Sequence, residues 1–531
     1  MEAYRQTGMG RSFSKAGAQI PAGKLYHAAS DRYYEITGNR MTRYQQGPAG
    51  HRVNETEKSI DYAVGSGNHA RTFLHRNPDG SLIELPVSWY SEKGGALAMS
   101  PGYDRPDHDD FRRRVPEDCM FCHNAYPRKH NALPEGIDCQ RCHGPASDHN
   151  SLVNPAKLSR DRQLDVCEQC HLEPTSSPPP SVVRRPERRP NSYKPGQSLT
   201  DYAVFFEAGI GDRFEVAHQG YRLRKSACFI KSAMTCTTCH DPHRAQPVSH
   251  FIDVCKSCHA AAHRAQEKKE NCLECHMWQR RTDDAPHVIM TDHYIQRRKP
   301  VLFASGAVTE RVPYFANENP GPQSYQRGID ASKSGDYSTA IHFFEQAIRE
   351  NDNPEESRRE IGAALMLSGN LSASIEQNEK LPGDPIALAN LGNAYLQTGR
   401  IDDAKRVLAK APDEPNANNL LGLACLKSGD TAAAESAFRR ALNLQPDLAE
   451  ANNNLGTLLA SRHNYAEAVW YFGKAVASNP ANAEFRHSFG LTLALTRDYR
   501  KARAELEEAL RLAPNSAEIR SDLDDVRRSA R

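Results

Sequence analysis

Two cysteines and a histidine recur in the spacing Cys-x-x-Cys-His at six places in the chain. Two thiols three positions apart can add to the two vinyl groups of one haem, and the imidazole that follows then lies under the iron as an axial ligand. The pattern therefore predicts six covalently bound haems of the c type. The attachment thiols would be those of Cys119, Cys122, Cys139, Cys142, Cys167, Cys170, Cys236, Cys239, Cys255, Cys258, Cys272 and Cys275. The proximal imidazoles would be those of His123, His143, His171, His240, His259 and His276.

Zinc is the main alternative occupant of these motifs, because paired Cys-x-x-Cys knuckles also form tetrahedral thiolate sites. Histidine occupies only 22 of the 531 positions, yet it directly follows all six cysteine pairs. Chance does not explain this coincidence, and zinc does not require it. The motifs use 12 of the 14 cysteines, which leaves Cys228 and Cys425, and neither needs a disulfide partner. We therefore expect haem in preference to zinc or disulfides.

The chain has more histidines than the six motifs use. Nineteen of the 22 precede residue 300, so 13 remain beyond the proximal six. Methionine as an axial ligand would raise the reduction potential, so this surplus favours low-spin, low-potential haems with two histidine ligands each. Histidines that closely follow a motif can reach a neighbouring haem from its exit loop. The predicted distal candidates are His69, His149, His218, His243, His263, His287 and His293. No catalytic residue is predicted.

The first 118 residues, which must pack against the first haems, are expected to be β-rich and irregular. One hairpin is predicted around the turn Thr37-Gly-Asn-Arg40 and another around Asn77-Pro-Asp-Gly80. Residues 119–300 are expected to form the multihaem domain. Roughly 180 residues around six porphyrins leave little protein core, so the macrocycles must supply buried apolar surface and regular secondary structure should be sparse. Such a domain should not fold without haem. Residues 301–322 are assigned to a linker.

A 34-residue repeat fills the remainder, residues 323–531. Gly422, Gly456 and Gly490 recur at this interval, and each is followed at fixed offsets by alanine, by an aromatic or leucine, and by proline. The pattern is typical of helix-turn-helix tetratricopeptide repeats. About six repeats and a polar last helix predict an all-α solenoid whose concave face binds a peptide or protein, or whose helices only brace the haem domain. Cys425 occupies an inward position and is expected to be a buried structural thiol.

Overall composition restricts the remaining function classes. With 38% hydrophobic and 25% charged residues the chain is typical of a globular protein, and it has no run of 18 apolar residues. Lys and Arg together number 68 against 66 for Asp and Glu, a formal net charge of +2. This balance argues against nucleic acid as the main partner.

The motifs resemble the multihaem c-type cytochromes of the superfamily that includes the tetrahaem partner of hydroxylamine oxidoreductase and the octahaem reductases. More closely, they resemble a bacterial class that fuses such a domain to tetratricopeptide repeats. The resemblance is carried by Thr7–Phe13, Gly65–Arg71, Met234–His243 and Cys275–Trp278, besides the repeats. It implies a multidomain protein in which an irregular, haem-packed cytochrome domain with a small β-rich N-terminal part precedes an all-α solenoid.

The resemblance also bears on the start of the chain and on its compartment. In that class a segment like Tyr4–Phe13 follows a further Cys-x-x-Cys-His. We expect a truncated or misassigned start, with a signal peptide and a seventh haem upstream, because the first residues lack the features of a signal peptide. Covalent haem attachment in c-type cytochromes takes place outside the cytoplasmic membrane, so a periplasmic or extracellular location is expected.

Two functions follow from this interpretation. The first is electron transfer between a donor protein and an acceptor protein, with the repeats docking a partner. The alternative is a multihaem reductase of a small nitrogen or sulfur oxyanion such as nitrite, hydroxylamine or sulfite, which needs one haem iron with an open coordination position. Available histidines for every iron favour the electron carrier, and whether the chain is an enzyme stays open at this point.

Overall fold

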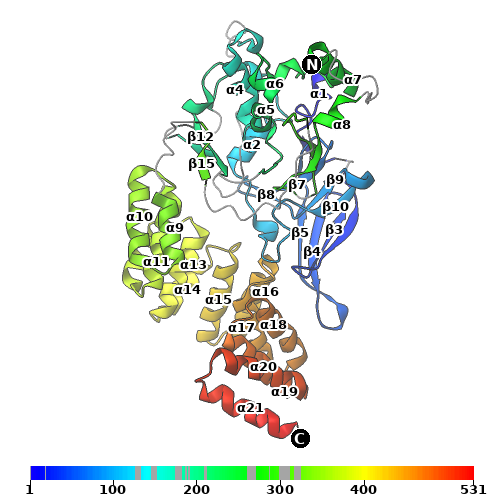
Figure 1. Cartoon of the computed structure of the whole chain (residues 1–531). Helices are drawn as coiled ribbons and strands as arrows, with labels where there is room; N and C mark the ends of the chain where they lie inside the picture. Colours follow the sequence, from blue (N-terminus) through cyan, green and yellow to red (C-terminus); the bar gives the residue numbers. More distant parts are fainter. Residues whose placement is uncertain are drawn as a thin grey trace. The chain divides into compact units, whose positions relative to one another are not determined.

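The computed structural model describes residues 2–17, 20–125, 133–144, 152–173, 182–185, 188, 192–208, 212–259, 271–285, 287–297, 311–315 and 324–530. The chain forms two compact units. The first comprises Met1–Ala29, Tyr34–Met41 and Lys58–Gly321, and the second comprises Ser30–Tyr33, Thr42–Glu57 and Pro322–Arg531. Figure 1 shows both units, with labels on many of their elements. Within the described residues, no helix combines the length and the apolar character needed to cross a membrane.

The N-terminal part is β-rich, as the sequence predicts. After α1 (Glu2–Arg5), one sheet has the order β1-β6-β7-β9-β10, with β8 paired to β7. A four-stranded sheet has the order β2-β3-β4-β5. The strands are β1 (Phe13–Lys15), β2 (Gly23–His27), β3 (Arg32–Thr37), β4 (Arg40–Gln46), β5 (Arg52–Ser59), β6 (Tyr62–Val64), β7 (Ala70–Arg76), β8 (Leu82–Glu84), β9 (Val87–Tyr90) and β10 (Ala96–Met99).

Both predicted hairpins form. Gly38 adopts a positive φ of 59° between β3 and β4, and Gly80 adopts 87° between β7 and β8. Glycine takes these conformations without steric cost, which is why the two turn sequences are effective hairpin signals. A core of buried residues that includes Tyr34, Met41 and Phe73 lies beneath the strands.

The region that carries the cysteine motifs contains short helices and short strands. Its helices are α2 (Glu117–His123), α3 (Gln140–His143), α4 (Arg160–His171), α5 (Gln219–Arg224), α6 (Ala227–Ile230), α7 (Val248–Cys258) and α8 (Cys272–His276). Its strands are β11 (Val182–Arg184), β12 (Ala203–Ala208), β13 (Gln279–Arg281), β14 (Ile289–Thr291) and β15 (Arg311–Pro313). β11, β12 and β15 form one sheet, and β13 pairs with β14. Apart from 311–315, the predicted linker 301–322 lies outside the described residues.

The second unit contains the repeat helices. They are α9 (Ser324–Lys333), α10 (Tyr337–Glu350), α11 (Pro354–Leu367), α12 (Leu371–Glu379), α13 (Pro385–Gln397), α14 (Ile401–Leu408), α15 (Pro415–Lys427), α16 (Thr431–Leu444), α17 (Ala449–Ser461), α18 (Tyr465–Ser478), α19 (Ala483–Leu495), α20 (Tyr499–Leu512) and α21 (Ala517–Ser529). Consecutive helices pack in pairs, and the first helices of successive pairs contact one another from α11 to α19. This stacking is that of a helical solenoid and confirms the all-α prediction.

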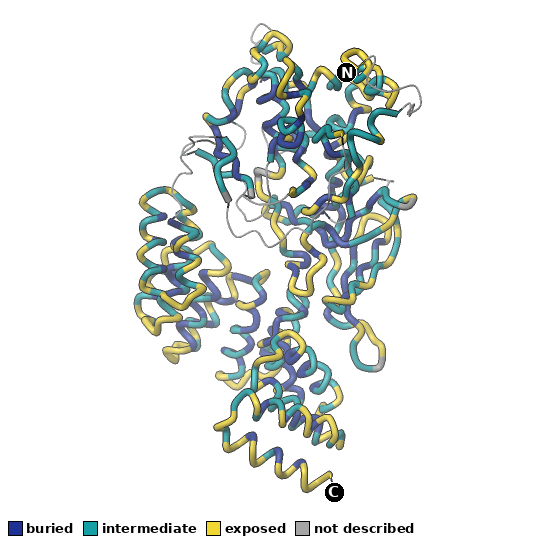
Figure 2. The backbone as a smooth tube through the Cα atoms, in the orientation of Figure 1, coloured by how far each residue is buried: buried dark blue, intermediate teal, exposed yellow. Residues whose placement is uncertain are grey.

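The last helix, α21, has one apolar face. Ile519, Leu523 and Val526 are buried at spacings of four and three, while much of the helix is exposed (Figure 2). A polar outer face of this kind terminates the stacking of a solenoid. Cys425, on α15, is buried with 6% of its surface exposed, as its inward repeat position predicts.

Candidate cofactor-attachment sites

Each of the six motifs lies on a tight helical turn. Three lie within α2, α4 and α8. In the others, backbone hydrogen bonds close the turn from the histidine N–H to the first cysteine carbonyl, at 2.9 Å for His143, 3.0 Å for His240 and 3.0 Å for His259. Residues at positions i, i+3 and i+4 share one face of a helix. Every motif therefore directs two thiols and one imidazole to the same side.

The motif cysteines are chemically available. None of the 14 cysteines of the chain forms a disulfide. Thiols of different motifs lie within hydrogen-bonding reach: Cys170 beside Cys122, and Cys236 beside Cys167. The contact with Cys122, together with burial, raises the pKa of Cys170 well above its usual value. These contacts place the first motif beside the third, and the third beside the fourth.

Three of the proximal candidates have one ring nitrogen fixed by an oxygen. His143 Nδ1 donates to the carbonyl of Val153 at 2.9 Å. His171 Nδ1 donates to Gln219 Oε1 at 3.0 Å, and His276 Nδ1 donates to the carbonyl of Gln296 at 2.7 Å. A neutral imidazole that donates from Nδ1 keeps its lone pair on Nε2, which is the tautomer that binds a metal.

His123 differs because its Nδ1 is buried and has no hydrogen-bond partner among the residues that the structure describes. Burial and the neighbouring His171 lower the pKa of His123 to about 4. The ring is therefore neutral at pH 7, as metal ligation requires. Together, the paired thiols, the neutral rings and the oriented tautomers fit the donor set of a c-type haem, although the attachment itself stays a prediction.

Two distal candidates each lie opposite a proximal histidine. The ring centroids of His143 and His243 are 6.0 Å apart, with 23° between the ring planes. Those of His240 and His293 are 6.1 Å apart, with 29° between the planes. His243 Nδ1 lies 3.4 Å from Asp241 Oδ1, and His293 Nδ1 donates to the carbonyl of Thr291 at 3.1 Å.

The other distal candidates are placed differently. His218 is fully buried, and its Nδ1 accepts the backbone N–H of Glu215 at 3.1 Å, so the proton of the neutral ring is on Nε2. Burial, followed by the charge of Arg222, lowers the pKa of His218 to about 3. His287 Nε2 lies 3.2 Å from Asp104 Oδ1. His69 is exposed on a bend, and His149 and His263 lie outside the described residues.

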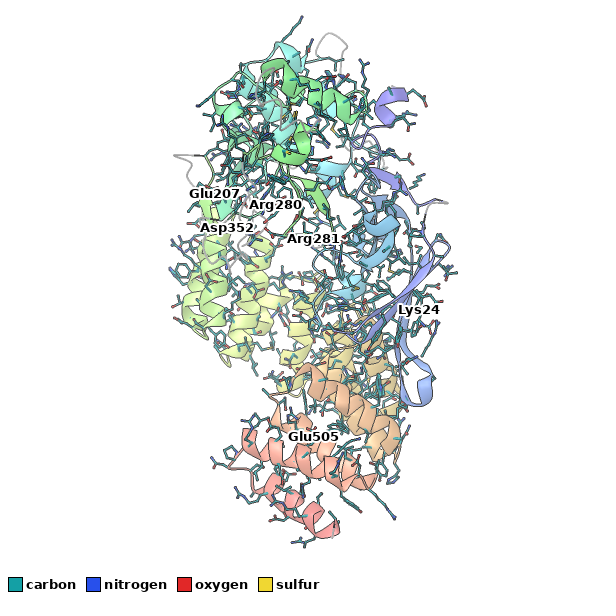
Figure 3. The ribbon with its side chains drawn as sticks, turned by 45° about the vertical axis from the view of Figure 1, so that its right-hand side comes forward. Lys24, Glu207, Arg280, Arg281, Asp352 and Glu505 are labelled. Carbon is teal, nitrogen blue, oxygen red and sulfur yellow. The ribbon has the colours of Figure 1, made fainter. Side chains whose placement is uncertain are left out.

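A buried ion-pair network fixes the segment that carries His293. Arg222 is fully buried and makes two bonds to Asp292, from Nε at 2.9 Å and from Nη2 at 2.6 Å. Arg280, labelled in Figure 3, also reaches Asp292 at 3.1 Å. Asp292 Oδ1 accepts the backbone N–H of Tyr294 at 2.8 Å, and Ser226 Oγ donates to the His293 carbonyl at 3.1 Å. These contacts fix the residues before and after His293 in the sequence, as well as its own carbonyl.

Sequence reasoning missed these supporting residues. Gln219 orients His171 from 48 positions away, and Arg222 pairs with Asp292 from 70 positions away. Val153 and Gln296 act through backbone carbonyls, which any residue could supply. Only Asp241, two residues from His243, had a local signal, because aspartate commonly orients a nearby metal-binding imidazole.

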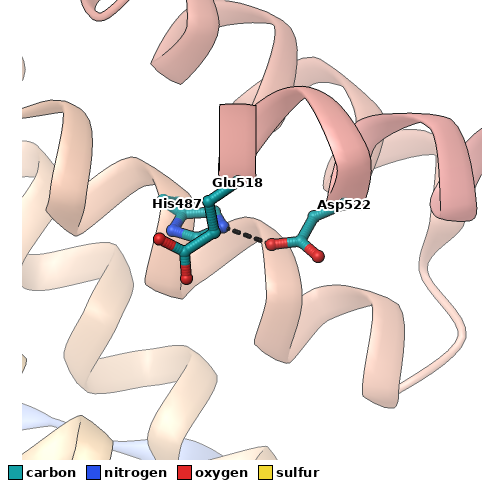
Figure 4. A group of neighbouring side chains, drawn as sticks. All are labelled: His487, Glu518 and Asp522. Carbon is teal, nitrogen blue, oxygen red and sulfur yellow. Dashed lines mark hydrogen bonds and ion pairs between the residues drawn. The ribbon is translucent and has the colours of Figure 1, made fainter. Parts of the chain in front are cut away.

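A separate group in the repeats contains His487, Glu518 and Asp522 (Figure 4). His487 Nε2 bonds to Asp522 Oδ2 at 2.7 Å, whereas Glu518 is exposed. The bond links α19 to α21. We interpret it as a hydrogen bond that fastens the last helix.

Comparison with known proteins identifies the repeats directly. The tetratricopeptide-repeat family model matches residues 325–385, 389–452 and 453–517. The photosystem I assembly protein Ycf3 of Synechococcus sp. (strain CC9605) is 25% identical over 142 residues, which are 24% of this chain and 81% of that protein. The repeats therefore provide surfaces for protein–protein interaction.

A multihaem cytochrome is also similar to part of this chain. Multiheme cytochrome MtrA of Shewanella baltica (strain OS185) is 24% identical over 242 residues, which are 36% of this chain and 57% of that protein. The chain thus spans little more than half the length of this relative.

Solved structures are also similar to part of this chain. The crystal structure of MamA is 24% identical and covers 30% of this chain and 97% of that chain, with a TM-score of 0.26. Pseudomonas aeruginosa PilF is 18% identical and covers 38% of this chain and 96% of that chain, with a TM-score of 0.34.

Proposed function

We propose that the chain is an extracytoplasmic multihaem c-type cytochrome that passes single electrons between redox proteins, and that its repeats dock a protein or peptide partner. One observation carries the proposal: six helical turns each present two thiols and one imidazole on the same face. The similarity to a multiheme cytochrome, at 24% identity, supports it.

Haem bound at these turns would supply a one-electron couple at its iron. The residues of this chain would attach it and set its properties. The cysteine pairs would fix the position of each group covalently, and imidazoles whose Nδ1 is already engaged, such as those of His143 and His276, would bind from Nε2. Hydrogen bonds to Nδ1 raise the basicity of a ligand and so lower the reduction potential of its site.

Close approach of neighbouring motifs supports transfer within the protein. Cys122 lies beside Cys170, and Cys167 lies beside Cys236, so groups attached to the first, third and fourth motifs would be near neighbours. Electrons could then cross the domain in short steps. No substrate-binding residue is required for this activity.

Docking is assigned to the inner surface of the solenoid. The first helices of successive pairs contact each other from α11 to α19, which places them along one side. Stacked repeats present such a side as an extended, concave binding surface. We propose that this surface recruits a donor or acceptor to the haem domain.

Haem content tests the first part of the proposal. The full chain, with an export signal added, would be produced in a bacterium that matures c-type cytochromes. We expect an intact mass increased by six haems and the absorption of thioether-linked haem. The double change Cys272→Ser and Cys275→Ser should remove one haem, whereas Cys228→Ser should remove none. Zinc bound at the motifs, without haem, would refute the proposal.

Spin state and electron transfer test the second part. We expect low-spin iron by electron paramagnetic resonance, rapid reduction by a small donor and rapid reoxidation by a small acceptor. A high-spin signal that changes on addition of nitrite, hydroxylamine or sulfite would instead identify a reductase.

A further inference from the structure

Two histidine pairs in the cysteine-rich region have the geometry of ligands on opposite sides of one metal ion. Building on the proposed function, we infer that His143 and His243 bind the two faces of one haem iron, and that His240 and His293 bind the two faces of another. The single turn His240–His243 would then serve two irons at once.

The distances between the ring centroids match those expected for two ligands of one metal ion. An imidazole nitrogen lies about 2 Å from a metal ion that it binds, and the ring centroid lies about 1 Å further out, so two rings on opposite sides of one ion have centroids about 6 Å apart. The observed separations are 6.0 Å for His143 and His243 and 6.1 Å for His240 and His293. The ring planes make angles of 23° and 29°, and two ligand planes can contain the same ligand–metal axis at any mutual angle, so the separation is the observation that supports each pairing.

The ring nitrogens carry the second step. His143 Nδ1 donates to the Val153 carbonyl and His293 Nδ1 donates to the Thr291 carbonyl, while His243 Nδ1 lies 3.4 Å from the Asp241 carboxylate. In His143 and His293 a carbonyl accepts from Nδ1, which leaves the lone pair on Nε2 for a metal; in His243 the carboxylate lies within reach of Nδ1.

Another close histidine pair shows that proximity alone is not enough. The ring centroids of His27 and His108 are also close, at 5.5 Å. Both nitrogens of His108 are engaged: Nδ1 accepts the backbone N–H of Asp110 at 3.1 Å, and Nε2 lies 3.3 Å from Tyr34 Oη. That ring has no nitrogen available for iron.

The support of His293 is specific to this role. The buried bonds between Arg222 and Asp292 and the hydrogen bond from Ser226 fix the residues on both sides of His293, yet none of them engages its Nε2. The ring is thus positioned rigidly while its coordinating atom is kept unblocked.

The pairing has a consequence for the electron path. His240 and His243 are separated only by Asp241 and Pro242, and three residues span at most about 10 Å. The irons bound through the second and fourth motifs would therefore be joined by one short covalent link. This link would hold the two sites at a fixed, short distance.

Ligand removal in the haem-loaded full chain tests the inference. His243→Ala and His293→Ala should each convert one iron of six from low-spin to high-spin in electron paramagnetic resonance, without loss of haem by mass. Added imidazole should restore the low-spin signal. His243 is 66% exposed, so its removal opens no core. Because His293 is mostly buried, His293→Met provides a second variant, which should stay low-spin and raise the midpoint potential of one haem.

A matched control comes from a histidine whose Nε2 is already engaged. His250 Nε2 donates to the Cys239 carbonyl at 3.2 Å. His250→Ala should leave every iron low-spin.

A double-variant experiment assigns each distal residue to its motif. Cys139→Ser with Cys142→Ser removes the haem of the second motif, and in that background His243→Ala should produce no high-spin iron. Cys236→Ser with Cys239→Ser should abolish the effect of His293→Ala in the same way. Fully low-spin iron in His243→Ala or His293→Ala with all haems present, or a high-spin signal that persists after loss of the paired motif, would overturn the pairing. A wild-type chain without covalent haem would instead refute the proposed function.

Discussion

Gly422 on α15 lies so close to Phe438 on α16 that a Cβ atom at position 422 would be 2.4 Å from Cε1 of the phenylalanine ring. The same contact recurs in the other helix pairs, and the partner always follows the glycine by sixteen positions in the sequence. The pairs are Gly328 with Phe344, Gly362 with Asn378, Gly392 with Leu408, Gly456 with Phe472 and Gly490 with Leu506. In each repeat, a side chain of the second helix packs directly against a glycine of the first helix, and this contact holds the two helices together.

Gly422→Ala should weaken the solenoid. The new methyl group must displace Phe438, whose exposed fraction is 0%, and overpacking of a core costs about 1–3 kcal/mol. Denaturant unfolding followed by helical circular dichroism would measure the loss. Gly383→Ala is the matched control, since a Cβ there meets nothing within 4 Å. Equal stability of the two variants would contradict this account of the repeat.

In the helix pair α11–α12, by contrast, a substitution should increase stability. Asn378 replaces the usual aromatic or leucine opposite Gly362, and within the described part of the chain its buried Oδ1 has no hydrogen-bond partner. Leu408 and Leu506 occupy the equivalent position in other repeats, so Asn378→Leu should fit and should raise the unfolding free energy by about 1–2 kcal/mol. The change also removes the bond from Asn378 Nδ2 to the Ser374 carbonyl. A loss of stability would mean that this bond outweighs the unpaired oxygen.

Local patterns were enough to predict the repeats and the hairpins. The 34-residue spacing encodes contacts such as Gly422 with Phe438, which lie within one helix pair, and the turns at Gly38 and Gly80 depend on the conformational freedom of glycine. The twelve motif cysteines and six proximal histidines were equally evident, because their spacing along one helical turn defines the candidate site.

Distal pairing could not be predicted in the same way. His143 and His243 meet only because the chain returns after a hundred residues, and no local spacing records that path. The acceptors that orient His143 and His276 are backbone carbonyls, which leave no mark in the sequence. His218 behaves differently, because its contact is local. Its Nδ1 accepts the backbone N–H of Glu215, three residues earlier in the chain.

Arg222→Met should strongly destabilise the cysteine-rich region. The change leaves the buried carboxylate of Asp292 with Arg280 as its remaining cation at 3.1 Å, and loss of one partner of a buried pair costs about 3–5 kcal/mol. Hydrogen exchange of the haem-loaded protein around β14 would report the loss. Arg281→Met is the matched control, because Arg281 is 52% exposed in its pair with Glu92 and should contribute less than about 1 kcal/mol. Similar exchange in both variants would show that the network does not hold this segment.

The stability of the sheet that contains β7 and β8 should depend on pH because of Glu84, which lies on β8. Burial on β8 raises its pKa to about 7 from an ordinary value of 4.5, although Arg113 at 3.2 Å acts in the opposite direction. The folded state then binds the proton more tightly than the unfolded state, so this stabilisation is complete below about pH 4.5 and is lost as the pH rises through 7.

A shift of this size corresponds to about 3 kcal/mol. Hydrogen exchange of β7 and β8 should therefore be slower at pH 5 than at pH 8 after correction for the intrinsic exchange rate, and Glu84→Gln should remove most of the difference. Glu55→Gln, on the exposed surface of β5, should leave the difference unchanged. If the dependence on pH persists in Glu84→Gln, another group must be responsible, since glutamine keeps the shape of the side chain but cannot bind the proton.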